Sequence, residues 1–369
     1  MRIMVTGGGT GGHTSPAVAV IEELQKRDPR LAVQWVGRKG AIEERVSKAL
    51  GVPFRSVSVE GWPRGKSLKK LWVAAKLAVA AGYAFLLLKR FRPQVVFAVG
   101  GYVSLPLAWA AQRLGIPTVL HEQNKRLGLA NRLLAQRAAR ILLSYPDTIG
   151  EYPRERARVV GNPVRAGFVR APSRMEARAK LGLDPAIPVV LVSGGSQGAR
   201  TLNTAMAEMI PQFHSEEAQV LWMTGTAAVA AARLVAEKAP VSAQVFAYID
   251  DMPTACAAAD LIVSRAGAST TAELAVLGKP SILVPYPHAT DNHQEQNARA
   301  FEQAGAAVVM LDHECGGANL LKCVRGLLGD SDRLAAMGSA AASLAKPGAT
   351  ESIAEEILSL VFDTARQED

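Results

Sequence analysis

The chain has 369 residues, 49% hydrophobic and 20% charged, and a single hydrophobic core stops growing at roughly 250–300 residues, so we expect two domains. Three cysteines, Cys256, Cys315 and Cys323, form no Cys-x-x-Cys pair. Their number and spacing argue against a disulfide framework or a cysteine zinc site and fit a reducing cytoplasm. The first residues read as a strand that enters a turn, and not as a secretory signal.

The net charge of +9 is concentrated in one segment. Gly61–Tyr145 contains fourteen Lys or Arg residues and one acid, Glu122, while the rest of the chain has a small excess of acids. A basic block of this kind indicates a nucleic acid, a polyanionic substrate or an anionic membrane as the partner.

Short apolar runs alternate with helical stretches, as in parallel sheets with crossover helices. In the first half the predicted strands are Ile3–Thr6, Val33–Val36, Arg55–Val59, Val95–Val99, Thr118–His121 and Arg140–Leu143. In the second half they are Val189–Val192, Val220–Met223, Val245–Tyr248, Leu261–Val263, Ser281–Val284 and Ala307–Met310. We therefore predict an α/β fold of two doubly wound domains joined near Gly161-Asn162-Pro163. A last helix over Ala349–Gln367 is expected to cross back onto the first domain.

Glycine-rich turns follow three of the predicted strands. The first, Gly7-Gly8-Gly9-Thr10-Gly11-Gly12-His13, precedes a helix predicted from about Pro16 and satisfies G-x-G-x-x-G. The dinucleotide fingerprint also needs an acid after the second strand, where Val36-Gly37-Arg38-Lys39 stands instead, so NAD is disfavoured and NADP stays open. With the turns at Gly100-Gly101 and Gly194-Gly195, the pattern predicts anionic ligands, such as two diphosphates, in a cleft between the domains.

Seven motifs, in order along nearly the whole chain, resemble the MurG family of UDP-N-acetylglucosamine–N-acetylmuramyl-(pentapeptide) pyrophosphoryl-undecaprenol N-acetylglucosamine transferases. They are Gly8-Gly9-Thr10-Gly11-Gly12-His13, Gly100-Gly101-Tyr102-Val103-Ser104, His121-Glu122-Gln123-Asn124, Gly161-Asn162-Pro163-Val164-Arg165, Gly194-Gly195-Ser196-Gln197-Gly198-Ala199-Arg200, Ile249-Asp250-Asp251-Met252 and Arg265-Ala266-Gly267-Ala268-Ser269-Thr270-Thr271-Ala272-Glu273.

The resemblance implies a GT-B fold, with an acceptor- and membrane-binding domain over 1–162, a UDP-GlcNAc-binding domain over 163–345 and the returning helix over 346–369. It implies metal-independent inverting transfer of GlcNAc from UDP-GlcNAc to the C4 hydroxyl of MurNAc in undecaprenyl-pyrophosphoryl-MurNAc-pentapeptide (lipid I), which gives lipid II for peptidoglycan, with no cofactor. It also implies peripheral attachment to the cytoplasmic face of the inner membrane, and other cell-wall or division proteins as partners.

Inverting transfer needs a base for the acceptor hydroxyl and stabilisation of the departing diphosphate. His13, at the start of the first predicted helix, is the preferred base, since an imidazole with its ordinary pKa near 6.5 is largely neutral at working pH. Alternatively, His13 caps the helix or hydrogen-bonds substrate. Glu122 is the second candidate, and it could instead be neutralised by Arg or Lys or orient His13.

Residues that match the family's donor and acceptor motifs are expected to bind the two substrates. For UDP-GlcNAc these are Thr10, Gly11, Gly12, Asn124, Arg165, Ser196, Ile249, Ala268, Ser269, Thr270, Thr271, Ala272, Glu273, His293 and Gln294, and for the acceptor diphosphate Gly101, Tyr102 and Ser104. Hydroxyl and N–H groups of Ser196 and the Ala268–Thr271 turn suit a diphosphate, and Glu273 suits two ribose hydroxyls. His293 stands where some relatives have Gln, which leaves its contact with the sugar open. The pair Asp250-Asp251 is expected to cap a helix near Met252, and no metal site is predicted.

The run Leu71–Leu88 is almost entirely apolar and is flanked by basic residues. A spanning helix needs about 20 apolar residues, whereas this run is interrupted by Lys76 and followed directly by a strand. We expect one face to cover the sheet and the other to lie in lipid headgroups. The predicted membrane residues are Lys69, Lys70, Trp72, Phe85, Lys89 and Arg90.

Three other interpretations stay open at this point. A UDP-GlcNAc 2-epimerase or a transferase with another acceptor would share the fold, but an epimerase needs no membrane. A nonenzymatic UDP-sugar-binding or lipid-binding protein would not need His13 and Glu122. Nucleic-acid binding would require aromatic residues interleaved with the basic ones, and here the basic residues bracket an apolar helix, so we expect no nucleic-acid partner.

Overall fold

The computed structural model describes residues 1–8, 11–61 and 69–368. Within them the chain forms two compact units. Unit 1 consists of Met1–Arg165 together with Lys346–Asp369, and unit 2 of Ala166–Ala345. The predicted junction at Gly161-Asn162-Pro163 thus falls at the end of the first stretch of unit 1.

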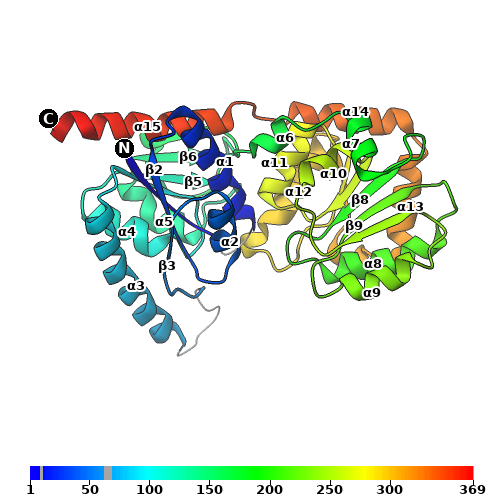
Figure 1. The fold of residues 1–369 in the computed structure, drawn as a ribbon, viewed down its shortest axis with the longest axis horizontal. Helices are drawn as coiled ribbons and strands as arrows, with labels where there is room; N and C mark the ends of the chain where they lie inside the picture. The colour runs from blue at the N-terminus through cyan, green and yellow to red at the C-terminus, as the bar shows by residue number, and fades with distance from the viewer. Residues whose placement is uncertain (9–10, 62–68, 369) are drawn as a thin grey trace. The chain divides into compact units, whose positions relative to one another are not determined.

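Unit 1 is built on a seven-stranded parallel sheet with the order β3-β2-β1-β4-β5-β6-β7. Its strands are β1 (Arg2–Thr6), β2 (Ala32–Gly37), β3 (Phe54–Ser56), β4 (Val95–Ala98), β5 (Thr118–Glu122), β6 (Arg140–Leu143) and β7 (Ala157–Val159). Its helices are α1 (Gly11–Arg27), α2 (Ile42–Ala49), α3 (Lys69–Phe91), α4 (Leu105–Arg113), α5 (Leu129–Leu134) and α15 (Ala349–Glu368). Strand order and crossover helices are those of a doubly wound domain (Figure 1).

Unit 2 repeats this plan with six parallel strands in the order β10-β9-β8-β11-β12-β13. The strands are β8 (Val189–Ser193), β9 (Gln219–Met223), β10 (Ala243–Phe246), β11 (Leu261–Ser264), β12 (Ser281–Leu283) and β13 (Ala307–Val309). The helices are α6 (Ala166–Val169), α7 (Arg174–Leu181), α8 (Arg200–Met209), α9 (Val229–Ala236), α10 (Met252–Ala258), α11 (Ala268–Leu277), α12 (His293–Gln303), α13 (Gly317–Leu328) and α14 (Ser331–Ser343). The predicted fold class is confirmed.

Differences from the predicted elements are confined to edges and ends. Strand β7 was not predicted, because three residues after the charged segment Arg154–Arg156 carry no apolar run. Strands β3 and β10 each end before the predicted Val59 and Tyr248. Helix α1 begins at Gly11, ahead of Pro16, so His13 lies in its first turn.

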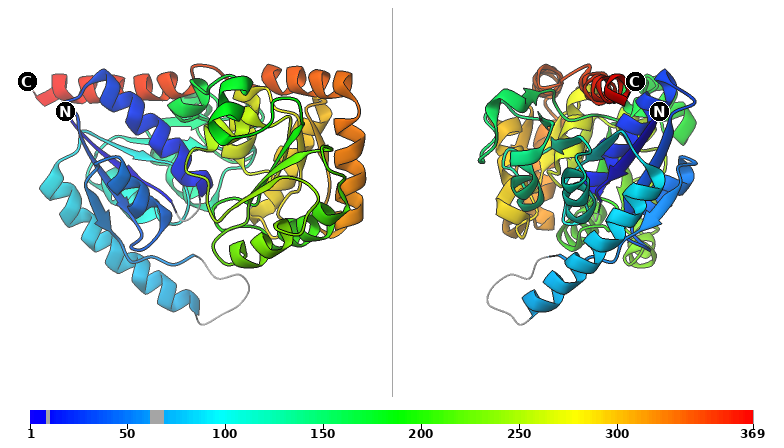
Figure 2. Two further views of the ribbon diagram at one scale, coloured as in Figure 1. Left: turned by 45° about the vertical axis from the view of Figure 1, so that its right-hand side comes forward. Right: turned by 90° about the vertical axis from the view of Figure 1, so that its left-hand side faces the viewer.

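The C-terminal helix α15 packs on unit 1, as predicted. Ile353, Ile357 and Val361 are fully buried in one cluster with Ile3 and Val5 of β1. Their spacing of four residues places them on one face of the helix, and fully burying an Ile side chain contributes about 1.5–3 kcal/mol. Figures 1 and 2 show α15 lying along this unit.

Helix α3 has two different faces. The side chains of Val73, Ala80, Ala84, Leu87 and Leu88 are buried, and the last four join a core cluster with Val96 and Leu107. The opposite face is exposed although it is apolar: Trp72 is 60% exposed, Val79 75% and Leu86 65%. The first turns of α3 extend past the rest of the unit (Figures 1 and 2).

Candidate active site

The carboxyl ends of the unit 1 strands are organised around the buried carboxylate of Glu122, the last residue of β5. Its Oε1 accepts hydrogen bonds from the backbone N and the side-chain Nδ2 of Asn124, both at 3.1 Å. Its Oε2 accepts from the backbone N of Gly128 at 2.8 Å and from Asn131 Nδ2 at 2.9 Å. Four donors, from residues up to nine positions away, therefore hold the 123–131 loop against the sheet.

Burial raises the pKa of Glu122 above its ordinary value, and the four hydrogen bonds lower it in part. All four partners are donors, which a carboxylate accepts without rearrangement. No Arg or Lys of the described chain forms an ion pair with Glu122. The geometry gives Glu122 an organising role and leaves no lone pair directed at an acceptor hydroxyl.

His13 lies against the second glycine turn of this unit. A Cβ added at Gly100 would be 3.3 Å from Cδ2 of His13, and one at Gly101 would be 2.9 Å from the carbonyl oxygen of Gly8. Both glycines have positive φ, +86° and +77°, so they supply a backbone conformation that other residues rarely adopt. Two of the predicted glycine turns thus meet at the imidazole of His13.

His121, next to Glu122 on β5, is fully buried. Its Nε2 is 3.2 Å from the carbonyl oxygen of Gly161 and 3.5 Å from Ser144 Oγ. Burial is the main cause that lowers the pKa of His121 to about 4. A neutral ring whose Nε2–H donates to Gly161 is consistent with this pKa.

The turn predicted for the acceptor diphosphate presents Tyr102 and not Ser104. Ser104 is buried, and its hydroxyl donates to the carbonyl oxygen of Gly101 at 2.8 Å. The hydroxyl of Tyr102 accepts from Arg38 Nη1 at 3.0 Å. The sequence interpretation did not assign Arg38 to this turn, since 64 residues separate it from Tyr102, although its position after β2 placed it at the same edge of the sheet.

In unit 2 the turn after β8 brings Ser196 to the carboxyl end of the sheet. Gly198, with φ +75°, leaves no room for a side chain, because a Cβ there would be 2.0 Å from the carbonyl oxygen of Thr224. Gly225 has the same constraint toward the carbonyl oxygen of Gln197, at 2.5 Å. The backbones after β8 and β9 therefore interlock, which sets the position of the Ser196 turn.

The donor run Ala268–Glu273 forms the first turns of α11, directly after β11. Ala268, Ser269 and Thr271 are buried, whereas Thr270, Ala272 and Glu273 are partly exposed. The hydroxyl of Thr271 donates to the carbonyl oxygen of Ala268 at 3.0 Å and so serves the helix. The helix N-terminus remains a favourable place for a diphosphate.

Other predicted donor residues lie in the loops after the neighbouring strands. Ile249 is buried, and its backbone N donates to Met223 Sδ at 3.3 Å. His293 begins α12 with Nδ1 2.7 Å from the carbonyl oxygen of Thr290, and burial lowers its pKa. Gln294 Oε1 accepts from the backbone N of Tyr286 at 3.0 Å.

Three further predictions concern a cap, a junction and the first turn. Asp251 is the N-cap of α10 and accepts hydrogen bonds from Thr254, so the predicted cap is confirmed for Asp251 of the pair. Arg165 is the partly buried last residue of the first stretch of unit 1, and Gly11 and Gly12 are the first residues of α1. Thr10 lies outside the described residues. In the described ranges, no three His, Cys, Asp or Glu side chains are grouped to hold a metal ion.

Gly198→Ala is expected to destabilise unit 2 strongly, because the new Cβ would collide with the backbone of Thr224 and φ is positive. We expect the unfolding free energy to fall by about 2–4 kcal/mol, seen as a lower urea midpoint by circular dichroism. Gly195→Ala is the matched control, since φ is +82° but no atom lies within 4 Å of its Cβ, and it is expected to lose only about 1–2 kcal/mol. Equal midpoints for the two variants would contradict the interlock.

Two family models match the chain in the expected order. Residues 3–143 match the glycosyltransferase family 28 N-terminal domain, and residues 189–353 match the C-terminal domain of the same family. A UDP-N-acetylglucosamine–N-acetylmuramyl-(pentapeptide) pyrophosphoryl-undecaprenol N-acetylglucosamine transferase from Desulforudis audaxviator is 41% identical over 97% of this chain and 98% of its own length. A transferase of the same name from Desulfitobacterium hafniense is 39% identical over 99% of this chain and 100% of its own length.

Solved structures agree with these relatives. The crystal structure of Acinetobacter baumannii MurG has a TM-score of 0.74 and 28% identity over 97% of this chain and 99% of that one. A UDP-GlcNAc 2-epimerase from Neisseria meningitidis has a TM-score of 0.65 and 14% identity, over 97% of this chain and 100% of that one. At that identity the epimerase shares the fold alone.

Two Rossmann-like units with glycine turns at the carboxyl ends of their strands, matched by both family 28 domains, define a glycosyltransferase of the GT-B class. Nearly full-length identity of about 40% narrows the class further. The chain belongs to the MurG family of UDP-N-acetylglucosamine–N-acetylmuramyl-(pentapeptide) pyrophosphoryl-undecaprenol N-acetylglucosamine transferases.

Proposed function

We propose that this chain transfers GlcNAc from UDP-GlcNAc to the C4 hydroxyl of MurNAc in lipid I, with inversion at the sugar C1, to give lipid II. The observation that carries the proposal is the near-complete coverage of relatives bearing that name, at about 40% identity. The glycine turns at His13 and at Ser196 suit two diphosphate-bearing substrates.

In this proposal each unit supplies a different part of the reaction. His13 accepts the proton of the MurNAc hydroxyl, and the Gly100–Tyr102 turn with Arg38 holds the acceptor diphosphate. The N-terminus of α11 and the Ser196 turn stabilise the negative charge of the departing UDP. Glu122 acts as a positioning residue that keeps Asn124 in place.

The direct test is incubation with radiolabelled UDP-GlcNAc and a lipid-linked MurNAc-pentapeptide acceptor. We expect labelled disaccharide-lipid product together with UDP. If well-folded protein binds UDP-GlcNAc but makes no product, the proposal that lipid I is the acceptor is refuted. If it converted UDP-GlcNAc to its C2 epimer, the epimerase alternative would replace this proposal.

We also propose that the exposed face of α3 holds the enzyme at the cytoplasmic face of the inner membrane, beside its lipid-linked acceptor. Among the described residues one helix, Lys70–Phe91, has the length and apolar composition of a membrane span. However, one face of it belongs to the core of unit 1. An amphipathic position in the interface accounts for both observations.

The polar and aromatic residues around this face support the proposal. Lys89 and Arg90 are exposed at one end of α3, and Lys70 stands at the other; the side chain of Lys69 lies outside the described residues. Trp109 of α4 is 38% exposed and packs edge-to-face on Phe85, with 6.0 Å between the ring centroids. Aromatic rings of this kind are enriched at membrane interfaces.

Reversing Lys69, Lys70, Lys89 and Arg90 to Glu is expected to abolish sedimentation with phosphatidylglycerol vesicles. Four basic residues contribute about 4 kcal/mol, or roughly a thousand-fold in affinity. A second variant, Leu71→Ser with Val79→Ser and Leu86→Ser, is expected to lose binding while keeping the charge. Leu234→Ser is the control, because Leu234 is an exposed apolar residue (61%) on another helix, α9. Unchanged sedimentation of both test variants would overturn the membrane face.

Roles in cell shape and division, and contacts with other wall-building proteins, follow within the same proposal. Lipid II is the precursor that wall assembly consumes, so loss of its synthesis would impair both processes. Depletion of this protein in its host is expected to give rounded or lysing cells, and normal growth after depletion would refute that role.

A further inference from the structure

A cavity of about 370 Å³ opens at the amino ends of neighbouring strands of unit 2. Pro188 precedes β8, Asp260 precedes β11 and Lys279-Pro280 precede β12. The predicted UDP-GlcNAc residues of unit 2 follow the carboxyl ends of strands in the same sheet, so this cavity lies at the opposite edge. It shares no lining residue with the proposed donor site.

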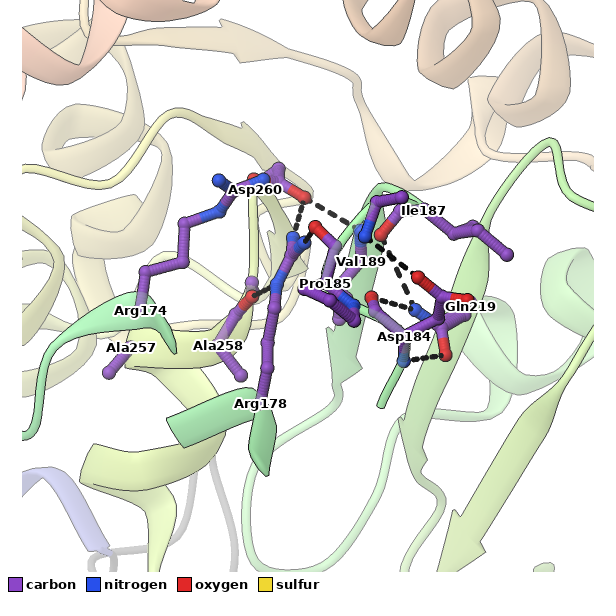
Figure 3. A network of polar contacts seen from close by, with 12 residues as sticks. Arg174, Arg178, Asp184, Pro185, Ile187, Val189, Gln219, Ala257, Ala258 and Asp260 are labelled. Carbon is purple, nitrogen blue, oxygen red and sulfur yellow. Dashed lines mark hydrogen bonds and ion pairs between the residues drawn. The ribbon is translucent and has the colours of Figure 1, made fainter. Parts of the chain in front are cut away.

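The only carboxylate in the lining, Asp260, is already fully engaged (Figure 3). Its Oδ1 is 2.8 Å from Arg174 Nη2, and its Oδ2 accepts from the backbone N of Val189 at 2.7 Å and from Arg178 Nη2. Arg178 is buried and also donates to the carbonyl oxygens of Ala258 and Pro185. One carboxylate thus serves two guanidinium groups.

Lys279 brings a third positive charge to the same place. Its Nζ donates to the carbonyl oxygens of Ala257 at 2.8 Å and Ala259 at 2.7 Å. In the described part of the chain no carboxylate lies within ion-pair distance of it. Burial lowers the pKa of Lys279 to about 8, although Cys256 and Asp260 raise it. A half-buried ammonium without a carboxylate partner is favoured by an added anion.

The balance of charge and the shape of the cavity indicate the ligand class. In the lining, Arg174 and Lys279 exceed the single carboxylate Asp260 by one positive charge. Behind the lining, Arg178 interacts electrostatically with Asp184. Pro188, Pro280, Leu328 and Leu334 make the rest of the wall apolar. A volume at the small end of ligand pockets, which span about 300–1,000 Å³, suits a molecule much smaller than a nucleotide sugar.

We propose that this cavity binds a small organic phosphomonoester, whose phosphate contacts Lys279 and Arg174 and whose organic part packs on Leu328 and Leu334. A phosphomonoester is a dianion at neutral pH, since its second pKa is about 6. It offers two charges and three acceptor oxygens to Lys279 and Arg174, whereas a carboxylate of similar size offers one charge and two oxygens. The side chain of Arg174 is 56% exposed, so it can turn toward the phosphate. Arg178 then remains paired with Asp260.

The test uses phenyl phosphate as the probe and acetylation of Lys279 as the readout. Intact protein is treated with acetic anhydride at pH 8, and the modified fraction at Lys279 is compared with that at exposed Lys322 by mass spectrometry. We expect phenyl phosphate to protect Lys279 at least tenfold and Lys322 not at all. Benzoate, which has the same ring and a single charge, is expected to protect much less.

Arg174→Gln supplies the matched variant, with the exposed Arg170→Gln as its control. Losing one charge-assisted hydrogen bond is expected to weaken phenyl phosphate binding about tenfold or more in calorimetric titration. Lys279→Met is expected to remove binding, and Arg174→Gln keeps the test valid if that variant does not fold. Equal acetylation with and without phenyl phosphate, or undiminished affinity in Arg174→Gln, would overturn the site. These readouts do not depend on transfer activity.

Discussion

His13→Ala is expected to lose GlcNAc transfer by about 10²–10⁴-fold, the range that a positioned general base contributes, while UDP-GlcNAc binding is retained. The imidazole lies at the meeting point of two glycine turns, and a Cβ added at Gly100 would be only 3.3 Å from His13 Cδ2. Removing the ring takes away the proposed base without a change to the turns, because alanine is compatible with the first turn of α1.

The experiment compares single-turnover transfer with UDP-GlcNAc affinity in the same preparations. His214→Ala, in the exposed loop before β9, is the control and is expected to transfer at the wild-type rate. Full activity in His13→Ala would move the base elsewhere. His293 would then be next, because a Nδ1–H directed at Thr290 leaves its Nε2 as the basic nitrogen, and His293→Ala would be expected to show the loss instead.

The fold was predictable from the sequence because parallel strands buried on both faces leave apolar runs that alternate with helices. All twelve predicted strands overlap strands of the two sheets, and only β7, three residues without an apolar run, was missed. The C-terminal helix was equally readable, because Ile353, Ile357 and Val361 repeat every four residues.

The glycine turns of the site could be predicted from the sequence, but the hydrogen-bond partners of its side chains were harder to predict. Glycines with positive φ at Gly101 and Gly198 mark where backbones approach one another, and this is visible in the sequence as glycine clusters. Asn131 and Arg38 carry no such mark. Each acts through a residue distant along the chain, Glu122 and Tyr102 respectively, and only the folded register of the strands brings those pairs together.

Glu122→Ala is expected to destabilise unit 1 by about 3 kcal/mol or more, since each buried donor left without a partner costs about 1–3 kcal/mol. The donors concerned are the backbone N–H groups of Asn124 and Gly128 and the amide of Asn131. Urea unfolding measures the loss. Glu355→Ala is the control. The side chain of Glu355 on α15 is 66% exposed and pairs with Arg27, so its loss is expected to change the unfolding free energy by less than about 1 kcal/mol.

The pH dependence of Glu122→Gln tests whether burial outweighs the four hydrogen bonds in setting the pKa of Glu122. Because the folded pKa of Glu122 is raised, the folded unit holds a proton there more tightly than the unfolded chain does. The wild-type protein therefore loses stability at this position as the pH rises from the ordinary pKa of Glu through the raised one. Glutamine does not titrate, and His121 contributes equally to both proteins. We thus expect the unfolding free energy of wild type relative to Glu122→Gln to fall as the pH rises above about 4.3. A pH-independent difference would show that Glu122 titrates alike in the folded and unfolded chains.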